Sequence, residues 1–133
     1  MPLVLDTTVL IAAERGGAAI DEVVGDEDDV AIAAVTAAEL LVGVELAKGA
    51  RRKARRSFVD PLLESLPVEP YDLEAARSHA QLLAHTRRTG RARGAHDLLI
   101  AATALACGRT VVTADAAGFD DLPGLGVRVL PEP

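Results

Sequence analysis

The sequence is poor in aromatic residues and contains a single cysteine. Its 133 residues include two Phe, one Tyr and no Trp. Base stacking on an aromatic platform, as in many RNA-binding modules, is therefore not expected. Cys107 has no cysteine to pair with, so an intramolecular disulfide and a Cys-rich zinc site are both excluded.

Long apolar segments and a basic leader are also missing. The longest apolar stretches, residues 30–38 and 98–107, are too short to cross a bilayer. The N-terminal segment has no basic start and reaches an acid at Asp6, which is unlike a signal peptide. We therefore expect a cytoplasmic protein without membrane segments, and the length predicts one domain over residues 1–133.

Positive charge is scarce overall but concentrated in two runs. The net charge is -6, yet six of the 14 Lys and Arg residues lie within 48–56 and four within 87–93. Such runs are usually solvated faces, but they can also contact the phosphates of a nucleic acid. For the second run we favour a role in binding substrate phosphates, because its loop leads directly into Asp97, an acid at the start of a predicted helix; its members are Arg87, Arg88, Arg91 and Arg93.

Apolar runs and helical periodicities alternate along the chain. Short apolar runs predict strands at 2–5, 30–34, 66–69, 110–113 and 126–130. Helical spacing predicts helices at 7–14, 18–24, 36–48, over the basic run as far as Leu63, at 72–88 and at 96–107. Because the strands are solidly apolar and alternate with helices, we predict an α/β fold. Its central sheet should have about five mostly parallel strands, with helices on both faces.

Four acids occupy positions where such a sheet gathers its ligands, beyond the carboxyl ends of the strands. Asp6 follows the first strand and Asp115 the fourth, while Glu39 and Asp97 lie near the starts of helices. Two carboxylates ~4 Å apart repel by on the order of 4 kcal/mol at a dielectric of 20. A cluster of them favours a hard cation, Mg²⁺ or Mn²⁺, which suits hydrolysis of a phosphodiester.

Each acid also has an ordinary structural interpretation. Asp6 could cap its helix, and Glu39 could form a capping box with Thr36. Asp97 could favour a helix N-terminus through the dipole, and Asp115 could be a turn residue. Taken singly these alternatives carry at least equal weight, so the argument rests on the four acids together.

The segments around these acids resemble the motifs of PIN-domain ribonucleases, including the VapC-type toxins of bacterial type II toxin–antitoxin pairs. The resemblance spans nearly the whole chain, and four motifs in this order are fairly specific. They are DTTVLI at 6–11, TAAEL at 36–40, HDLLIAATA at 96–104, and TAD at 113–115 followed by Phe119.

This resemblance implies a three-layer PIN-like fold and RNA cleavage that depends on Mg²⁺ or Mn²⁺. It implies a homodimer inhibited by a small VapB-like antitoxin that covers the site. Asp6, Asp97 and Asp115 would bind metal, with Glu39 as a further catalytic acid. Supporting hydroxyls would come from Thr7, Thr8 and Thr113.

One position departs from the pattern of this family. Many relatives carry an acid or a His just before the phenylalanine of the fourth motif, where this chain has Gly118. A second metal ion is therefore in question. Asp120 or Asp121 could substitute, although both are better interpreted as surface turn residues.

Other interpretations stay open at this point. His96 could be a general base, but a polar surface role is more common. A haloacid-dehalogenase-like phosphatase would need a second Asp two residues after Asp6, where this chain has Thr8. A non-catalytic PIN-fold interaction module is the remaining alternative. The apolar faces of the helices at 36–48 and 58–63 could form a partner groove or simply be core.

Overall fold

The protein is represented by a computed structural model that describes residues 1–16 and 24–130. Strands and helices alternate along the described chain as expected, although the helix predicted at 18–24 lies almost entirely outside it. In order, the elements are β1 (Pro2–Leu5), α1 (Thr7–Glu14), β2 (Asp29–Ala33), α3 (Ala34–Leu46), α4 (Gly49–Ser65), β3 (Val68–Glu69), α5 (Leu73–Thr89), α6 (Ala95–Cys107), β4 (Thr110–Thr113), a 3-10 turn (Ala116–Gly118) and β5 (Val127–Val129).

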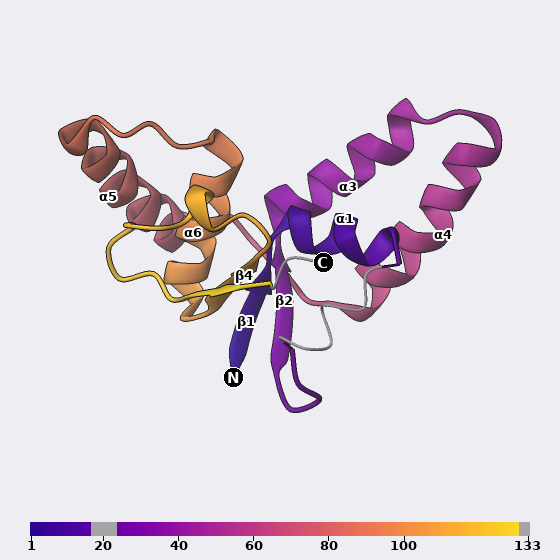
Figure 1. The fold of residues 1–133 in the computed structure, drawn as a ribbon, viewed down its shortest axis with the longest axis horizontal. Helices are drawn as coiled ribbons and strands as arrows, with labels where there is room; N and C mark the ends of the chain where they lie inside the picture. The colour runs from indigo at the N-terminus through magenta and orange to yellow at the C-terminus, as the bar shows by residue number, and fades with distance from the viewer. Residues whose placement is uncertain (17–23, 131–133) are drawn as a thin grey trace.

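The strands form one parallel sheet in the order β3-β2-β1-β4-β5 (Figure 1). The chain adds strands outward from β1 to β3 on one side, and then returns to place β4 and β5 on the other. This reversal puts a topological switch point between β1 and β4, the place where open α/β sheets usually bind ligands. The predicted parallel sheet is confirmed.

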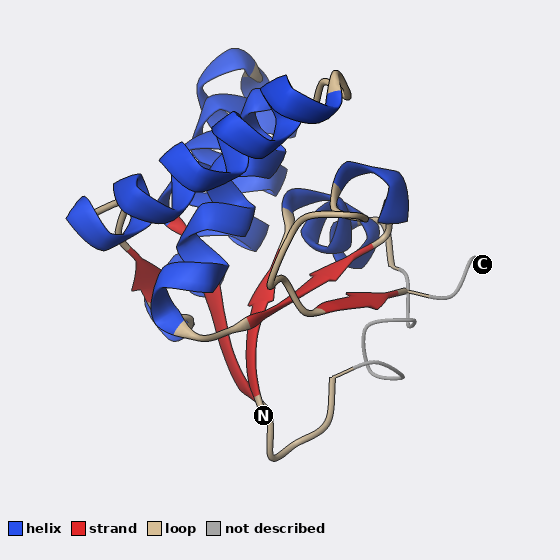
Figure 2. Ribbon diagram, turned by 90° about the vertical axis from the view of Figure 1, so that its left-hand side faces the viewer, coloured by secondary structure: helices blue, strands red, loops and turns tan. Residues whose placement is uncertain are grey.

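Helices cover both faces of the sheet (Figure 2). Because side chains alternate along a strand, Leu3 and Leu5 of β1 pack with α1, α3 and α4, whereas Val4 packs with α5 and α6. Each face therefore has its own apolar cluster, and the predicted three-layer architecture is confirmed.

Local sequence signals explain the ends of the two helices that lie on the α5–α6 face. The carboxylate of Asp72 accepts a hydrogen bond from the Ala75 amide at 3.0 Å and starts α5. Both helices end at a glycine in the left-handed region, Gly90 at φ 70° and Gly108 at φ 68°. Helix α6 consists mainly of Ala and Leu and is deeply buried. This packing holds the start of the helix beside the sheet.

The start of α3 differs from the prediction. The helix begins at Ala34, directly after β2, so Glu39 lies in its second turn rather than its first. Thr36 is buried inside the helix, its hydroxyl has no hydrogen-bond partner within the described residues, and Ala33 provides no side-chain cap. The capping-box interpretation of Thr36 and Glu39 is therefore wrong, because the strand runs into the helix without a turn.

In the described part of the chain, no helix has the length and apolar character that a bilayer-spanning segment would need.

Candidate active site at the carboxyl edge of the sheet

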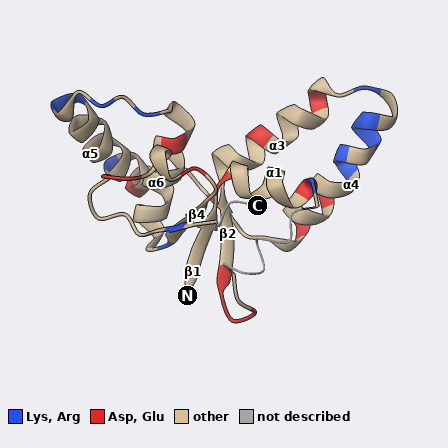
Figure 3. Ribbon diagram, in the orientation of Figure 1, with Lys and Arg blue, Asp and Glu red and all other residues tan. Residues whose placement is uncertain are grey.

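The four predicted acids lie around the switch point. Asp6 ends β1 and caps α1, and Asp115 follows β4 by two residues. Glu39 lies in the second turn of α3 and Asp97 in the first turn of α6. Figure 3 shows acidic positions at the start of α6 and along α3, whereas basic positions on α4 and at the end of α5 lie farther out.

Asp6 is buried, and both of its carboxylate oxygens are hydrogen-bonded. Oδ1 accepts from the Thr8 hydroxyl at 2.6 Å and the Val9 amide at 3.2 Å, and Oδ2 accepts from the Thr113 hydroxyl at 2.6 Å. Burial raises the pKa of Asp6, and these hydrogen bonds oppose that rise. Asp6 thus caps its helix, as the ordinary interpretation expected, while its second oxygen points toward β4.

Two threonine hydroxyls connect Asp6 to the loop that carries Asp115. Thr8 Oγ1 accepts from the Ala114 amide at 3.0 Å, and Thr113 Oγ1 accepts from the Asp115 amide at 2.9 Å. Because each hydroxyl also donates to Asp6, the two threonines hold the chain after β4 against the end of β1. This network fixes the relative positions of Asp6 and the Asp115 backbone.

The pKa of Asp97 is influenced by the charges of the other three acids. Burial is the main reason that its pKa is raised, and the negative charges of Asp6, Asp115 and Glu39 raise it further. The neighbouring His96 has a smaller effect in the opposite direction. All four acids therefore share one local field, although they come from four separate segments of the chain.

Two glycines enclose the Asp97 carboxylate. A Cβ atom on Gly118 would lie 2.7 Å from Asp97 Oδ2 and 3.7 Å from Asp115 Oδ2, and one on Gly94 would lie 3.1 Å from Asp97 Oδ2. The first distance is too short for any side chain at position 118 unless Asp97 moves. Glycine at this position therefore lets the backbone approach two of the acids closely.

Glu39 is oriented by two side chains. Its Oε1 accepts from the Thr7 hydroxyl at 3.0 Å and lies 3.3 Å from His96 Nδ1. His96 is 59% exposed, so its ring is open to solvent. The contact with Glu39 was missed by sequence reasoning, because the two residues are far apart in the chain and no local pattern links them.

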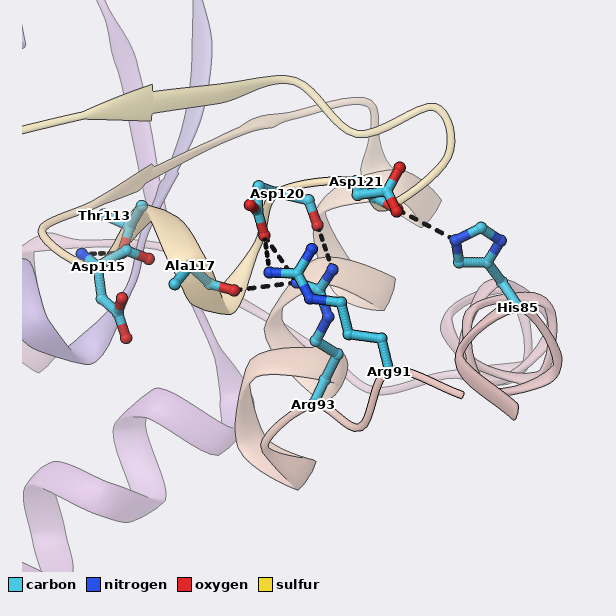
Figure 4. Close-up of polar contacts among 8 residues, drawn as sticks. All are labelled: His85, Arg91, Arg93, Thr113, Asp115, Ala117, Asp120 and Asp121. Atoms are coloured by element: carbon cyan, nitrogen blue, oxygen red, sulfur yellow. Dashed lines mark hydrogen bonds and ion pairs between the residues drawn. The ribbon is translucent and has the colours of Figure 1, made fainter. Parts of the chain in front are cut away.

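The arginines of the loop before α6 are engaged within the protein (Figure 4). Arg93 is 4% exposed and donates to the carbonyls of Ala117 and Asp120, while Arg91 donates to Asp120 Oδ1 at 2.8 Å. The loop is thereby tied to the turn after β4. Arg87 and Arg88, by contrast, are exposed at the end of α5.

The two acids that were considered as substitutes at the fourth motif lie in the turn that follows the 3-10 turn. The Asp120 carboxylate binds both loop arginines, and the Asp121 carbonyl accepts from His85 Nε2 at 3.1 Å (Figure 4). Asp121 also adopts φ 57°, as turn residues can. The interpretation of both as turn residues agrees with these contacts.

The residues at the site suit a hard divalent ion by their chemistry. Within the described residues, Asp6, Asp97 and Asp115 make no ion pair with Lys or Arg. Across residues 1–16 and 24–130, however, no three His, Cys, Asp or Glu side chains stand close enough to form a closed ion cage. These three acids thus form an open set of carboxylate oxygens that, among the described residues, has no Lys or Arg partner, and oxygen donors of this kind suit Mg²⁺ or Mn²⁺.

Comparison with known proteins agrees with this architecture. A family model described as the PIN domain matches residues 3–125. Ribonuclease VapC5 of Mycobacterium tuberculosis is 38% identical over 112 residues, which cover 84% of this chain and 82% of the relative. Ribonuclease VapC of Rickettsia bellii is 28% identical over 132 residues, which cover 98% of each.

A solved structure extends the match to three dimensions. The crystal structure of VapBC-5, a member of the VapBC family of toxin–antitoxin systems from Mycobacterium tuberculosis, superposes with a TM-score of 0.79 at 32% identity and covers 98% of each chain. Because the family model, a close relative and the fold all agree, the chain belongs to the PIN-domain family and, within it, to the VapC ribonucleases.

Proposed function

We propose that this protein is a Mg²⁺- or Mn²⁺-dependent endoribonuclease and the toxin of a toxin–antitoxin pair. The observation that carries the proposal is the gathering of four carboxylates at the switch point. Thr113 contacts both Asp6 and the Asp115 backbone, a Cβ at Gly118 would meet Asp97 and Asp115, and Glu39 contacts the neighbour of Asp97, His96. Membership of the PIN-domain ribonucleases implies a divalent ion, and the all-oxygen donor set favours Mg²⁺ or Mn²⁺.

Asp6, Asp97 and Asp115 are the residues that would hold the ion. A bound divalent ion polarises a phosphate oxygen and lowers the pKa of a water molecule. The protein's own contribution is orientation: Thr8 and Thr113 fix both oxygens of Asp6, and the glycines at 94 and 118 enclose Asp97. These contacts would keep the acids in place before the ion binds, when their mutual repulsion is not offset by a cation.

Glu39 is the acid best placed to act on the attacking water. It lies on α3, which carries none of the other three acids, and its side chain is about three-quarters buried. Thr7 and His96 both contact its Oε1. The other oxygen, Oε2, has no hydrogen bond within the described residues and could accept a proton from water. We therefore assign Glu39 as the general base and leave His96 as a group that orients it.

The phosphates of the RNA would meet basic side chains at the end of α5, farther out than the acids. Arg87 and Arg88 are exposed and available for such contacts. Arg91 and Arg93 contribute in another way, because they hold the loop before α6 against the turn after β4. We therefore place RNA contacts at the end of α5 and a positioning role on the loop.

A VapB-like antitoxin and a second copy of the chain are the proposed protein partners. The solved relative is a toxin–antitoxin complex. Here Leu46 is 77% exposed and borders a hollow of about 490 Å³ between α3 and α4, next to Lys48, Arg51 and Arg55. An antitoxin segment seated in this hollow could continue toward the acids and cover them. Action on cellular RNA would place the protein in the cytoplasm.

The test is cleavage of RNA by purified protein with Mg²⁺ or Mn²⁺. We expect cleavage to stop with EDTA and to fall at least a hundredfold in Asp6→Asn and Asp115→Asn. Asp60→Asn is the matched control, since Asp60 is an exposed acid on α4 that, within the described residues, pairs with Arg56 alone. Cleavage that survives both EDTA and Asp6→Asn would overturn the proposal and leave a non-catalytic interaction module.

A further inference from the structure

A second feature of α3 is an apolar pocket beside the acids. Its volume is about 470 Å³, and Val35, Ala38 and Val42 form its wall. These residues recur every three or four positions, so they share one face of the helix, whereas the core-facing residues Thr36, Leu40 and Val44 lie on another. Val42 is 53% exposed, so packing within the fold does not explain this apolar face.

The pocket is continuous with the candidate active site. Glu39 and His96 complete its lining, and both also belong to the group of catalytic acids and their partners. His96 directly precedes Asp97, and its ring is the only aromatic group among the described residues that line the pocket. A molecule bound to the acids at Asp97 would therefore reach this pocket with the part adjacent to its reacting group.

Resting on the proposed function, we propose that this pocket binds one nucleobase of the RNA, next to the phosphate that is cut. The apolar wall suits the flat face of a base, and the exposed imidazole of His96 offers a ring for stacking. The volume is larger than that of a single base, whether purine or pyrimidine. The chain thus has a stacking ring at its active site although it contains few aromatic residues.

The decisive experiment combines a variant that fills the pocket with substrates that lack single bases. Short RNA substrates carry one abasic nucleotide at successive positions around the cut. For the normal protein we expect KM to rise about tenfold when one particular base is missing, because stacking of that base is lost. In Ala38→Trp we expect KM for the intact RNA to rise by a similar factor, with no further rise when that base is removed.

Two further variants separate base binding from damage to the fold. Ala50→Trp makes the same change at an exposed alanine at the start of α4, outside this pocket, and should leave KM unchanged. His96→Ala should raise KM for intact RNA, and His96→Phe should restore it, since a phenyl ring can also stack. The catalytically disabled Asp6→Asn protein gives the same comparison by fluorescence anisotropy, without turnover.

The outcomes distinguish this proposal from the function on which it rests. Suppose that the normal protein cleaves RNA and Asp6→Asn does not, but that KM rises equally in Ala38→Trp and in the normal protein at every abasic position. The nucleobase proposal is then overturned, and the ribonuclease proposal stands. If Ala38→Trp instead changes the mass measured by light scattering, the pocket is a contact between copies of the chain. If the normal protein cleaves no RNA with Mg²⁺ or Mn²⁺, both proposals fall.

Discussion

Acids lie at both ends of the strands, which we call the amino edge and the carboxyl edge of the sheet, and their surroundings at the two edges shift their pKa values in opposite directions. At the amino ends of the strands, Asp28 pairs with the N-terminal ammonium at 3.3 Å and Arg128 at 3.5 Å, and Asp29 pairs with Arg109 at 3.3 Å. The pKa of Asp28 is lowered, mainly by a hydrogen bond from the Gly25 amide. At the carboxyl ends, burial and like charges raise the pKa of Asp97.

The opposite pKa shifts mean that acids at the amino edge stabilise the folded state at neutral pH, whereas acids at the carboxyl edge destabilise it. A carboxylate with a lowered pKa favours the folded state at neutral pH, and one with a raised pKa disfavours it. The chain could relieve the carboxyl edge with a single well-placed Lys or Arg, yet within the described residues Asp6, Asp97 and Asp115 form no such pair. Uncompensated charge at a ligand-binding edge is the pattern expected of a functional site.

The largest effect on stability should come from the amino edge, in Arg109→Met. Arg109 is 10% exposed and donates to the carbonyls of Leu3 and Asp29, besides pairing with Glu69 at 3.2 Å. Burial alone would lower the pKa of this guanidinium, but its hydrogen bonds and ion pairs raise it above the ordinary value. We expect urea denaturation to show a loss of about 3 kcal/mol, because buried partners are left unpaired.

Its control is Arg56→Met, which removes an exposed pair with Asp60 at 4.0 Å and should cost about 0.5 kcal/mol or less. Cleavage by the folded fraction of Arg109→Met should remain normal, since Arg109 lies at the opposite edge from the acids. Equal losses in the two arginine variants would show that the amino edge is not specially stabilised.

The next effect belongs to the carboxyl edge and concerns divalent ions. A ligand that binds only the folded protein at 100 times its Kd adds about 2.7 kcal/mol to stability. We therefore expect Mn²⁺ to raise Tm by on the order of 10 °C at that concentration. Asp97→Asn should lose most of this rise, and Asp28→Asn should retain it. A rise of the same size in Asp97→Asn would remove Asp97 from the metal ligands.

Much of this comparison could be anticipated from the sequence. Solid apolar runs predicted the strands, and an acid one or two residues beyond a buried strand, as at Asp6 and Asp115, predicted the group at the switch point. Threonines beside those acids were implied as supports, and the structure places them within hydrogen-bond distance.

What could not be anticipated depends on contacts between distant segments. Arg93 belongs to a basic run that is typical of a solvated or phosphate-binding surface, yet it is buried against the turn after β4. Similarly, Glu39 and His96 are joined only because α3 and α6 lie against each other. Neither contact has a local periodicity or spacing, so only the tertiary fold shows it.

The smallest effect is a pH dependence whose sign differs between the two edges. The folded-state pKa of Asp97 is raised above the ordinary 3.8, so the stability it contributes is present below pH 3.8 and is lost as pH rises through the raised value. For Asp28 the pKa is lowered, so its contribution is present above pH 3.8 and is lost as pH falls through the lowered value.

Asp97→Asn should therefore be more stable than the normal protein at neutral pH without divalent ions, and this advantage should vanish toward pH 3. Because Asp97 is only half-buried, solvent screens the repulsion, and we expect a gain of about 0.5–1 kcal/mol. Asp28→Asn should be less stable at neutral pH and should also converge at low pH. Thermal unfolding in EDTA from pH 3 to 7 measures both curves. If the stability of both variants at neutral pH differs from that of the normal protein in the same direction, the two edges do not differ in the way their contacts indicate. The uncompensated charge at the carboxyl edge would then not destabilise the fold, and a bound ion would have no repulsion to relieve.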